Sequence, residues 1–91
     1  METLDEIEKR LQNGRIDEVI LMLRHWIRHS AHPDDRAYYL LGNAYRKKGD
    51  FSQALNCYTE AETINPDSPA AEAHLMLMNI MEYYHKDYYN P

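Results

Sequence analysis

Three histidines stand at a spacing that a divalent-metal site on a helix could use. His25 and His29 are four residues apart, so they would share one helical face, and His32 follows shortly afterwards. The same segment carries Arg24 and Arg28, whose positive charge opposes a metal cation. The dipole at a helix C-terminus also favours imidazoles without any metal. We therefore predict no metal site in this protein.

The single cysteine, Cys57, is the strongest candidate for a catalytic nucleophile. It lies beside Tyr58 in a segment with helical periodicity, and no motif around it supplies a histidine or asparagine partner. We expect a structural thiol. Carboxylates such as Asp34, Asp35 and Asp67 fall where helices should begin, and capping accounts for them there. Since no glycine-rich phosphate loop is present either, the sequence predicts a protein that is not an enzyme and holds no cofactor.

The charge balance of the chain argues against nucleic acid as a partner. The 91 residues carry a net charge of -5, so no broad cationic field would attract phosphate backbones. The short run Arg46, Lys47 and Lys48 is typical of a helix end. One cysteine allows no internal disulfide, the N-terminus lacks the pattern of a signal peptide, and no apolar run reaches membrane-spanning length. The sequence therefore predicts a cytoplasmic protein that does not bind membranes.

Helices are the elements that would position these side chains. Two sets of apolar residues each recur with the period of one helical stripe: Tyr38, Leu41, Gly42 and Tyr45, then Leu55, Tyr58, Ala61 and Ile64. Gly49 and Asp50 separate the two stripes, as a left-handed stop and an N-cap, and Pro66 ends the second. Gly42 in mid-helix costs about 1 kcal/mol relative to alanine, which indicates that a neighbouring side chain lies close to the backbone there.

The same segment resembles the tetratricopeptide repeat family. The resemblance rests on eight residues spread over a period of about 34: Tyr38, Leu41, Gly42, Tyr45, Ala54, Tyr58, Ala61 and Pro66. Tyrosine stands at position 38, where the family usually has tryptophan, and at position 58, where it often has phenylalanine. The resemblance implies an all-α fold in which antiparallel helix-turn-helix hairpins stack as a short right-handed solenoid of five helices. It also implies a non-catalytic module that binds other proteins.

The chain divides into repeats within one domain. We predict a single domain over residues 1–91, because stacked hairpins with local contacts can be stable at this length. Residues 1–34 form a degenerate repeat, 35–68 the well-matched repeat and 69–85 a closing helix, and 86–91 are a short tail. The closing helix has no mate, so it should shield the last hairpin from water.

The first hairpin departs from the family pattern. Its helices are expected from about Leu4 to Asn13 and from Ile16 to near Ser30. Glu8 stands where glycine would be expected, and Val19 and Trp26 stand where small residues would be. We therefore expect its helices to pack at a different spacing.

The resemblance places partner binding on the first helices of successive repeats. In the family these helices line a concave groove for a peptide or partner helix, and here the groove would present Tyr39, Asn43, Arg46 and Lys47. Tyr39, Asn43 and Arg46 also follow helical spacing off the core stripe, which predicts that they face away from the core. An aromatic ring beside an amide and a guanidinium suits a peptide backbone and an acidic group. The expected partner is another protein or peptide, and an ordinary solvated helix face is the alternative.

One specialised form of this groove does not fit the sequence. Some relatives hold a C-terminal carboxylate with lysine, asparagine and arginine from successive repeats. Asn43 matches one position of that clamp, but Tyr39 replaces a lysine, and Ala70 and His74 stand where polar or basic groups are needed. The full clamp is therefore not expected here.

The closing helix has two apolar faces. Leu75 and Met76 are expected to cover the preceding hairpin, which leaves a separate stripe of Ala73, Leu77, Ile80 and Tyr84. Curvature of the stack, a folded-back tail or another chain could bury this stripe. Another chain would make the protein a self-associating structural unit, a homodimer with those four residues as its candidate interface.

Overall fold

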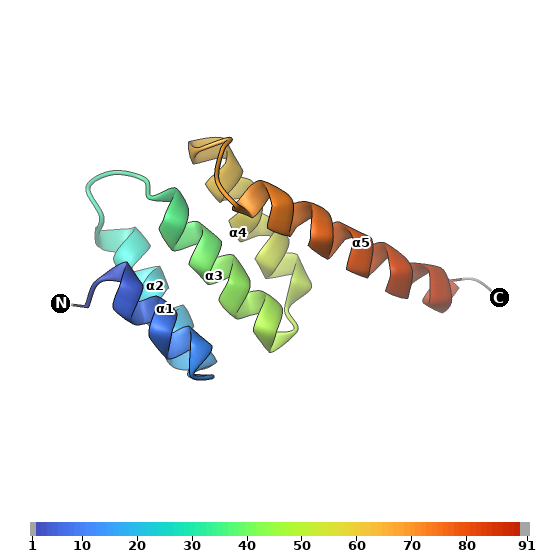
Figure 1. Ribbon diagram of the computed structural model, residues 1–91, viewed down its shortest axis with the longest axis horizontal. Coiled ribbons are helices and arrows are strands. Elements are labelled where there is room, and N and C mark those ends of the chain that lie inside the picture. The colour runs from blue at the N-terminus through green and yellow to red at the C-terminus, as the bar shows by residue number, and fades with distance from the viewer. Residues whose placement is uncertain (1, 90–91) are drawn as a thin grey trace.

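A computed structural model describes residues 2–89 of the chain, with side chains over residues 2–83. The five helices are α1 (Leu4–Gln12), α2 (Ile16–His29), α3 (Asp35–Lys48), α4 (Phe51–Ile64) and α5 (Ala70–Tyr89). No strand occurs within residues 2–89. The helices stack as two antiparallel hairpins and a last helix in a body of 51 × 28 × 18 Å (Figure 1). The predicted all-α fold of five helices is confirmed.

Local signals in the sequence set the turns of both hairpins. Gly14 and Gly49 follow the first helix of each hairpin with φ of 85° and 90°, a left-handed conformation that glycine adopts without strain. The Thr3 hydroxyl accepts the backbone N–H of Glu6 at 3.2 Å and caps α1. The Asp50 carboxylate caps α4 in the same way and accepts the backbone N–H of Gln53 at 3.2 Å.

The close approach predicted at Gly42 is present. Tyr58 of α4 is fully buried, and its ring lies so near Gly42 of α3 that a β-carbon built there would be 2.6 Å from Cε1 of the tyrosine. No real β-carbon tolerates that distance. The absence of a side chain at Gly42 therefore lets α3 and α4 form the tightest pair in the stack.

The first hairpin is more open than the central one. The contact between α1 and α2 is much smaller than that between α3 and α4, and α2 packs mainly against α3. Val19 and Leu23 of α2 are fully buried, whereas Trp26 is half-buried. This looser pairing accompanies the larger residues Glu8, Val19 and Trp26, which the sequence marked as departures from the repeat.

The last helix packs through a different face from the one expected. Leu75 and Met76, predicted to cover the preceding hairpin, are 67% and 55% exposed, so that prediction is wrong. Ala73 packs against the core and Leu77 is fully buried within the chain, so Leu77 cannot serve as a free interface residue. The small side chains of Ala70 and Ala73 explain the choice, because they let α5 approach α4 closely.

The last helix is also longer than predicted, and only part of its predicted interface can be described. Ile80 is 37% exposed, and the side chain of Tyr84 lies outside the described residues. The helix was expected to end near residue 85 before a short tail, but α5 continues to Tyr89. No glycine or proline interrupts residues 70–89, and their alanines, leucines and methionines favour helix.

Candidate functional site

The predicted partner-binding residues lie together on α3. In Figure 1, α1, α3 and α5 form one layer in front of α2 and α4. Lys47 is exposed, while Tyr39, Asn43 and Arg46 are half-buried. The last three therefore have one side against other side chains of the protein and the other toward solvent.

Tyr58 connects the core to this surface. Its hydroxyl donates a hydrogen bond to Oδ1 of Asn43 at 2.6 Å, and its ring centroid lies 6.2 Å from that of Tyr39. Burial raises the pKa of Tyr58 to about 12, so the phenol is protonated at neutral pH and remains a donor. The bond fixes the Asn43 amide with its oxygen toward Tyr58, which leaves the NH₂ group for other acceptors.

Arg46 has an unusual environment on the same surface. Its Nε atom is buried and has no hydrogen-bond partner within the described part of the chain. Its charge acts on Tyr58, where it opposes the rise in the pKa of the phenol. Buried polar atoms in proteins almost always have partners, so this N–H is a donor without its acceptor. Neither Arg46 nor the neighbouring Lys47 forms an ion pair among the described residues.

A small cavity extends this surface toward the start of α3. Its volume is about 200 Å³, and its lining residues are Asp35, Arg36, Tyr39, Ser68 and Pro69. Arg36 bonds Asp5 and Glu8 of α1, the latter at 3.0 Å, and so ties α1 to α3. Sequence reasoning missed Arg36, although it stands three residues before Tyr39 and therefore shares its helical face.

The two clamp positions on α5 have structural partners instead. Ala70 is buried, and its N–H donates to Oγ of Ser68 at 3.1 Å. Nδ1 of His74 lies 2.6 Å from Oε2 of Glu62 on α4. Neither position therefore offers an uncompensated charge to a ligand.

Cys57 is part of the hydrophobic core. Burial raises the pKa of its thiol to about 11, although the positive charge of Arg24 opposes the shift. The reactive form of cysteine is the thiolate, so this residue is protonated and unreactive at neutral pH.

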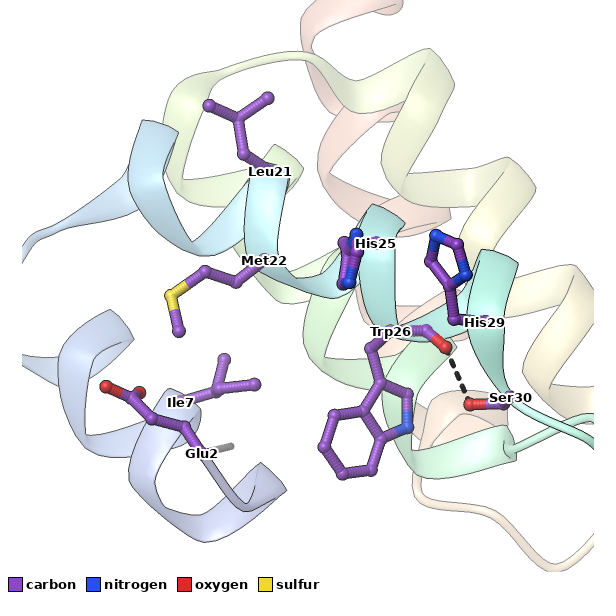
Figure 2. Close-up of a pocket in the computed structure, with 8 residues that line it drawn as sticks. All are labelled: Glu2, Ile7, Leu21, Met22, His25, Trp26, His29 and Ser30. Atoms are coloured by element: carbon purple, nitrogen blue, oxygen red, sulfur yellow. Dashed lines mark hydrogen bonds between the residues drawn. The ribbon is translucent and has the colours of Figure 1, made fainter.

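A larger cavity lies between α1 and α2 and was not foreseen from the sequence. Its volume is about 440 Å³, and most of its lining surface is apolar. The residues that line it are Glu2, Ile7, Leu21, Met22, His25, Trp26, His29 and Ser30. Figure 2 shows Met22 directed toward Ile7 across the opening, with the Trp26 ring beside them. The sequence signal that pointed to it is the pair Leu21 and Met22, two apolar residues outside the core stripe of α2.

The histidines considered as metal ligands lie at the rim of this cavity. The rings of His25 and His29 are 4.2 Å apart between centroids, and His32 is exposed in the loop that follows. Over the residues with described side chains, no three metal-ligating groups come together.

Comparison with known proteins identifies the repeat. The sequence model of the tetratricopeptide repeat family matches residues 35–68, which are the central hairpin and the turn after it. The chain is also similar to the Bacteroides fragilis protein BF1650, known from a solution NMR structure, with 43% identity and a TM-score of 0.86 over 99% of this chain and 91% of that one. No curated protein matches the chain.

These similarities agree with the geometry of the hairpins. In the part of the chain that the structure describes, no helix has the length and apolar character to cross a bilayer. Tetratricopeptide repeats typically bind other proteins and are generally not catalytic. The repeat match, the stacked hairpins and the contact of Gly42 with Tyr58 together show that this chain belongs to the tetratricopeptide repeat family.

Proposed function

We propose that the protein binds an acidic peptide segment of another protein on the surface formed by Tyr39, Asn43, Arg46 and Lys47. The observation that carries the proposal is the buried Nε of Arg46, which has no acceptor among the described residues. An unsatisfied buried donor destabilises a protein by roughly 1–3 kcal/mol. Since the Nε itself is buried, a carboxylate bound beside Arg46 would supply the missing acceptor once the guanidinium turns outward to meet it.

Each residue of the surface has a distinct role in this proposal. The guanidinium of Arg46 can form paired hydrogen bonds to a carboxylate, and Lys47 adds a second positive charge. The free NH₂ group of Asn43 can donate to a peptide carbonyl, since Tyr58 holds the amide in position. The half-buried ring of Tyr39 offers an apolar contact for a neighbouring side chain of the peptide.

A peptide library tests the proposal directly. Fluorescently labelled peptides that contain aspartate or glutamate would be compared, by fluorescence polarisation, with the same peptides carrying asparagine or glutamine. We expect the acidic set to bind and Arg46→Met to weaken binding about tenfold or more, because a charge-assisted hydrogen bond is lost. Lys9→Met is the control, since Lys9 is exposed on α1 and pairs with no described residue.

Stability measurements separate a binding role of Arg46 from a structural one. If Arg46 binds a ligand and does not stabilise the fold, the Arg46→Met variant should be at least as stable as the wild type in urea, because the substitution removes a buried unsatisfied donor. Acidic peptides that bind the Arg46→Met variant as tightly as the wild type would refute the proposal. So would a library in which acidic and amide peptides bind equally.

A further inference from the structure

We propose that the small cavity at the start of α3 receives one large apolar side chain of the acidic peptide, such as leucine. This anchor would stand three residues along the peptide from the acidic residue that meets Arg46. The inference rests on the proposed function and makes it more specific, because it gives the peptide a second contact at a defined spacing. Two observations carry it: the polar groups of the cavity already have partners, and Tyr39 and Arg46 lie at a fixed separation along α3.

The polar side chains that line the cavity are bonded within the protein. The Asp35 carboxylate accepts an N–H of the Asn65 amide at 3.3 Å. Oγ of Ser68 accepts the backbone N–H of Ala70 at 3.1 Å. The guanidinium of Arg36 is held by its two carboxylate partners on α1. None of the three therefore requires a polar group from a ligand, and a polar side chain placed here would lose its bonds to water without replacing them.

The size and walls of the cavity suit a single apolar side chain. Its volume of about 200 Å³ equals that of six or seven water molecules at about 30 Å³ each. This is room for one branched or aromatic side chain and too little for the face of another helix. Most of the lining surface is apolar, and Tyr39 and Pro69 belong to it. Since Tyr39 is also part of the proposed peptide-binding surface, the cavity and that surface are continuous, and an anchor of this kind typically contributes much of the affinity.

One face of α3 leads from the cavity to Arg46. Arg36, Tyr39, Asn43 and Arg46 follow one another at intervals of three, four and three residues, so they form one stripe along the helix. Tyr39 and Arg46 are seven residues apart, which is about 10.5 Å along the helix axis. The side chains of one helix lean in the same direction, so this separation also applies to the places where the two residues would meet a ligand.

Asn43 indicates the conformation of the bound peptide. It stands between the two contact points, and its NH₂ group is the donor proposed for a peptide carbonyl. The interior of a helical ligand could not accept this bond, because its carbonyls are bonded to its own N–H groups. An extended ligand has free carbonyls. Three residues of extended or polyproline II chain span about 9–10 Å, and in polyproline II they return to the same side of the chain.

Peptides that differ only in the anchor and its position test the inference on the unmodified protein. Each carries one glutamate and one leucine in a host of serine and alanine, with the pair two, three, four or seven positions apart and in both orders. Fluorescence polarisation should give the tightest binding at three positions. At that spacing, alanine in place of leucine should weaken binding about tenfold or more, because the buried apolar contact is lost.

Two proline variants show whether the anchor occupies this cavity. Pro69→Ala removes part of the apolar wall and should reduce the preference for leucine over alanine about threefold or more. Pro66→Ala is the matched control, since Pro66 is exposed in the same turn and does not line the cavity. Circular dichroism checks that both variants remain folded.

Three results would overturn the inference while the proposed function stands. The first is a preference for glutamate over glutamine without any preference for leucine over alanine. The second is equal or tighter binding at another spacing, and a maximum at seven would indicate a helical ligand. The third is a folded Pro69→Ala variant that keeps the full preference for leucine. Equal binding of glutamate and glutamine peptides would instead refute the proposed function, and the inference would fall with it.

Discussion

The central hairpin of α3 and α4 and the first hairpin of α1 and α2 use the same kind of turn but differ where their helices meet. In the central hairpin, Gly42 leaves room for the ring of Tyr58, and the two helices pack along their length. In the first hairpin, larger residues such as Glu8 and Trp26 occupy the places of small ones, and a cavity of about 440 Å³ remains beside α1 and α2. Residue size at the crossing thus separates a closed pair of helices from one that offers a groove.

The largest expected effect comes from filling the tight contact. Gly42→Leu should lower the free energy of unfolding by about 3 kcal/mol and Gly42→Ala by about 1, because the buried ring of Tyr58 cannot move aside without losing its bond to Asn43. Urea denaturation measures both. The comparison variant is Glu8→Ala, which changes the corresponding place in the open hairpin. It removes one of the two exposed ion pairs of Arg36 and should alter stability by less than about 0.5 kcal/mol. Equal losses in the two hairpins would show that the contact at Gly42 is not special.

A smaller effect should follow from removing one hydroxyl. Tyr58→Phe deletes the donor to Asn43 while keeping the ring over Gly42, and should cost about 1 kcal/mol in the free energy of unfolding. Tyr45→Phe is the matched control, since the Tyr45 hydroxyl has only a long contact of 3.4 Å with Arg24. Thermal melts of the two variants should therefore differ, with Tyr58→Phe the less stable.

Changes at the N-caps of α2 and α4 should alter the free energy of unfolding by a similar or smaller amount. Asp50 caps α4 with its side chain, whereas Arg15 at the same place before α2 forms no capping bond. Asp50→Ala should lower stability by about 1 kcal/mol, and Arg15→Ser should raise it by about 0.5 kcal/mol, because serine can accept an unpaired N–H of the first turn. Opposite shifts of the urea midpoint are the expected result; a loss of stability in both variants would contradict it.

The smallest effect should appear at alkaline pH and should depend on the central hairpin. The pKa of Tyr58 is raised from 10.0 to about 12, so above pH 10.0 the unfolded chain loses this proton first and unfolding becomes more favourable. Between neutral pH and pH 10.0, the wild type should therefore lose slightly more stability than Tyr58→Phe. Cys57, raised from 9.0 to about 11, acts in the same direction, while residues 4–29 contain neither residue type. Equal losses in wild type and Tyr58→Phe would contradict the assignment.

The sequence predicted the central hairpin well because its signals are local. Gly49 and Asp50 act on neighbours within one helical turn, and Tyr58 lies at a fixed distance from Gly42 along the repeat. The face of α5 could not be predicted in this way. Both sides of that helix are apolar, and the choice of Leu77 over Leu75 for burial depends on how closely α5 approaches α4.

Whether Tyr39, Asn43 and Arg46 bind a partner stays a prediction. Helical spacing predicts that they share one face of α3 and point away from the core, but in the structure all three are half-buried. The buried Nε of Arg46 and the bond that orients Asn43 depend on Tyr58 of another helix, so no spacing rule within α3 contains them. The α1–α2 groove is likewise a product of packing between helices.

The place of Trp26 has an optical consequence. It is the only tryptophan among the 91 residues, its ring lines the groove, and its N–H lies 3.4 Å from Oδ2 of Asp34. Tryptophan emission of the chain therefore originates at the first hairpin, in a cavity that Arg46 does not line. A ligand that displaced water from the groove would shift the indole emission to shorter wavelength, whereas a peptide bound on α3 would leave the spectrum unchanged. The protein thus carries a built-in reporter that distinguishes occupancy of one surface from occupancy of the other.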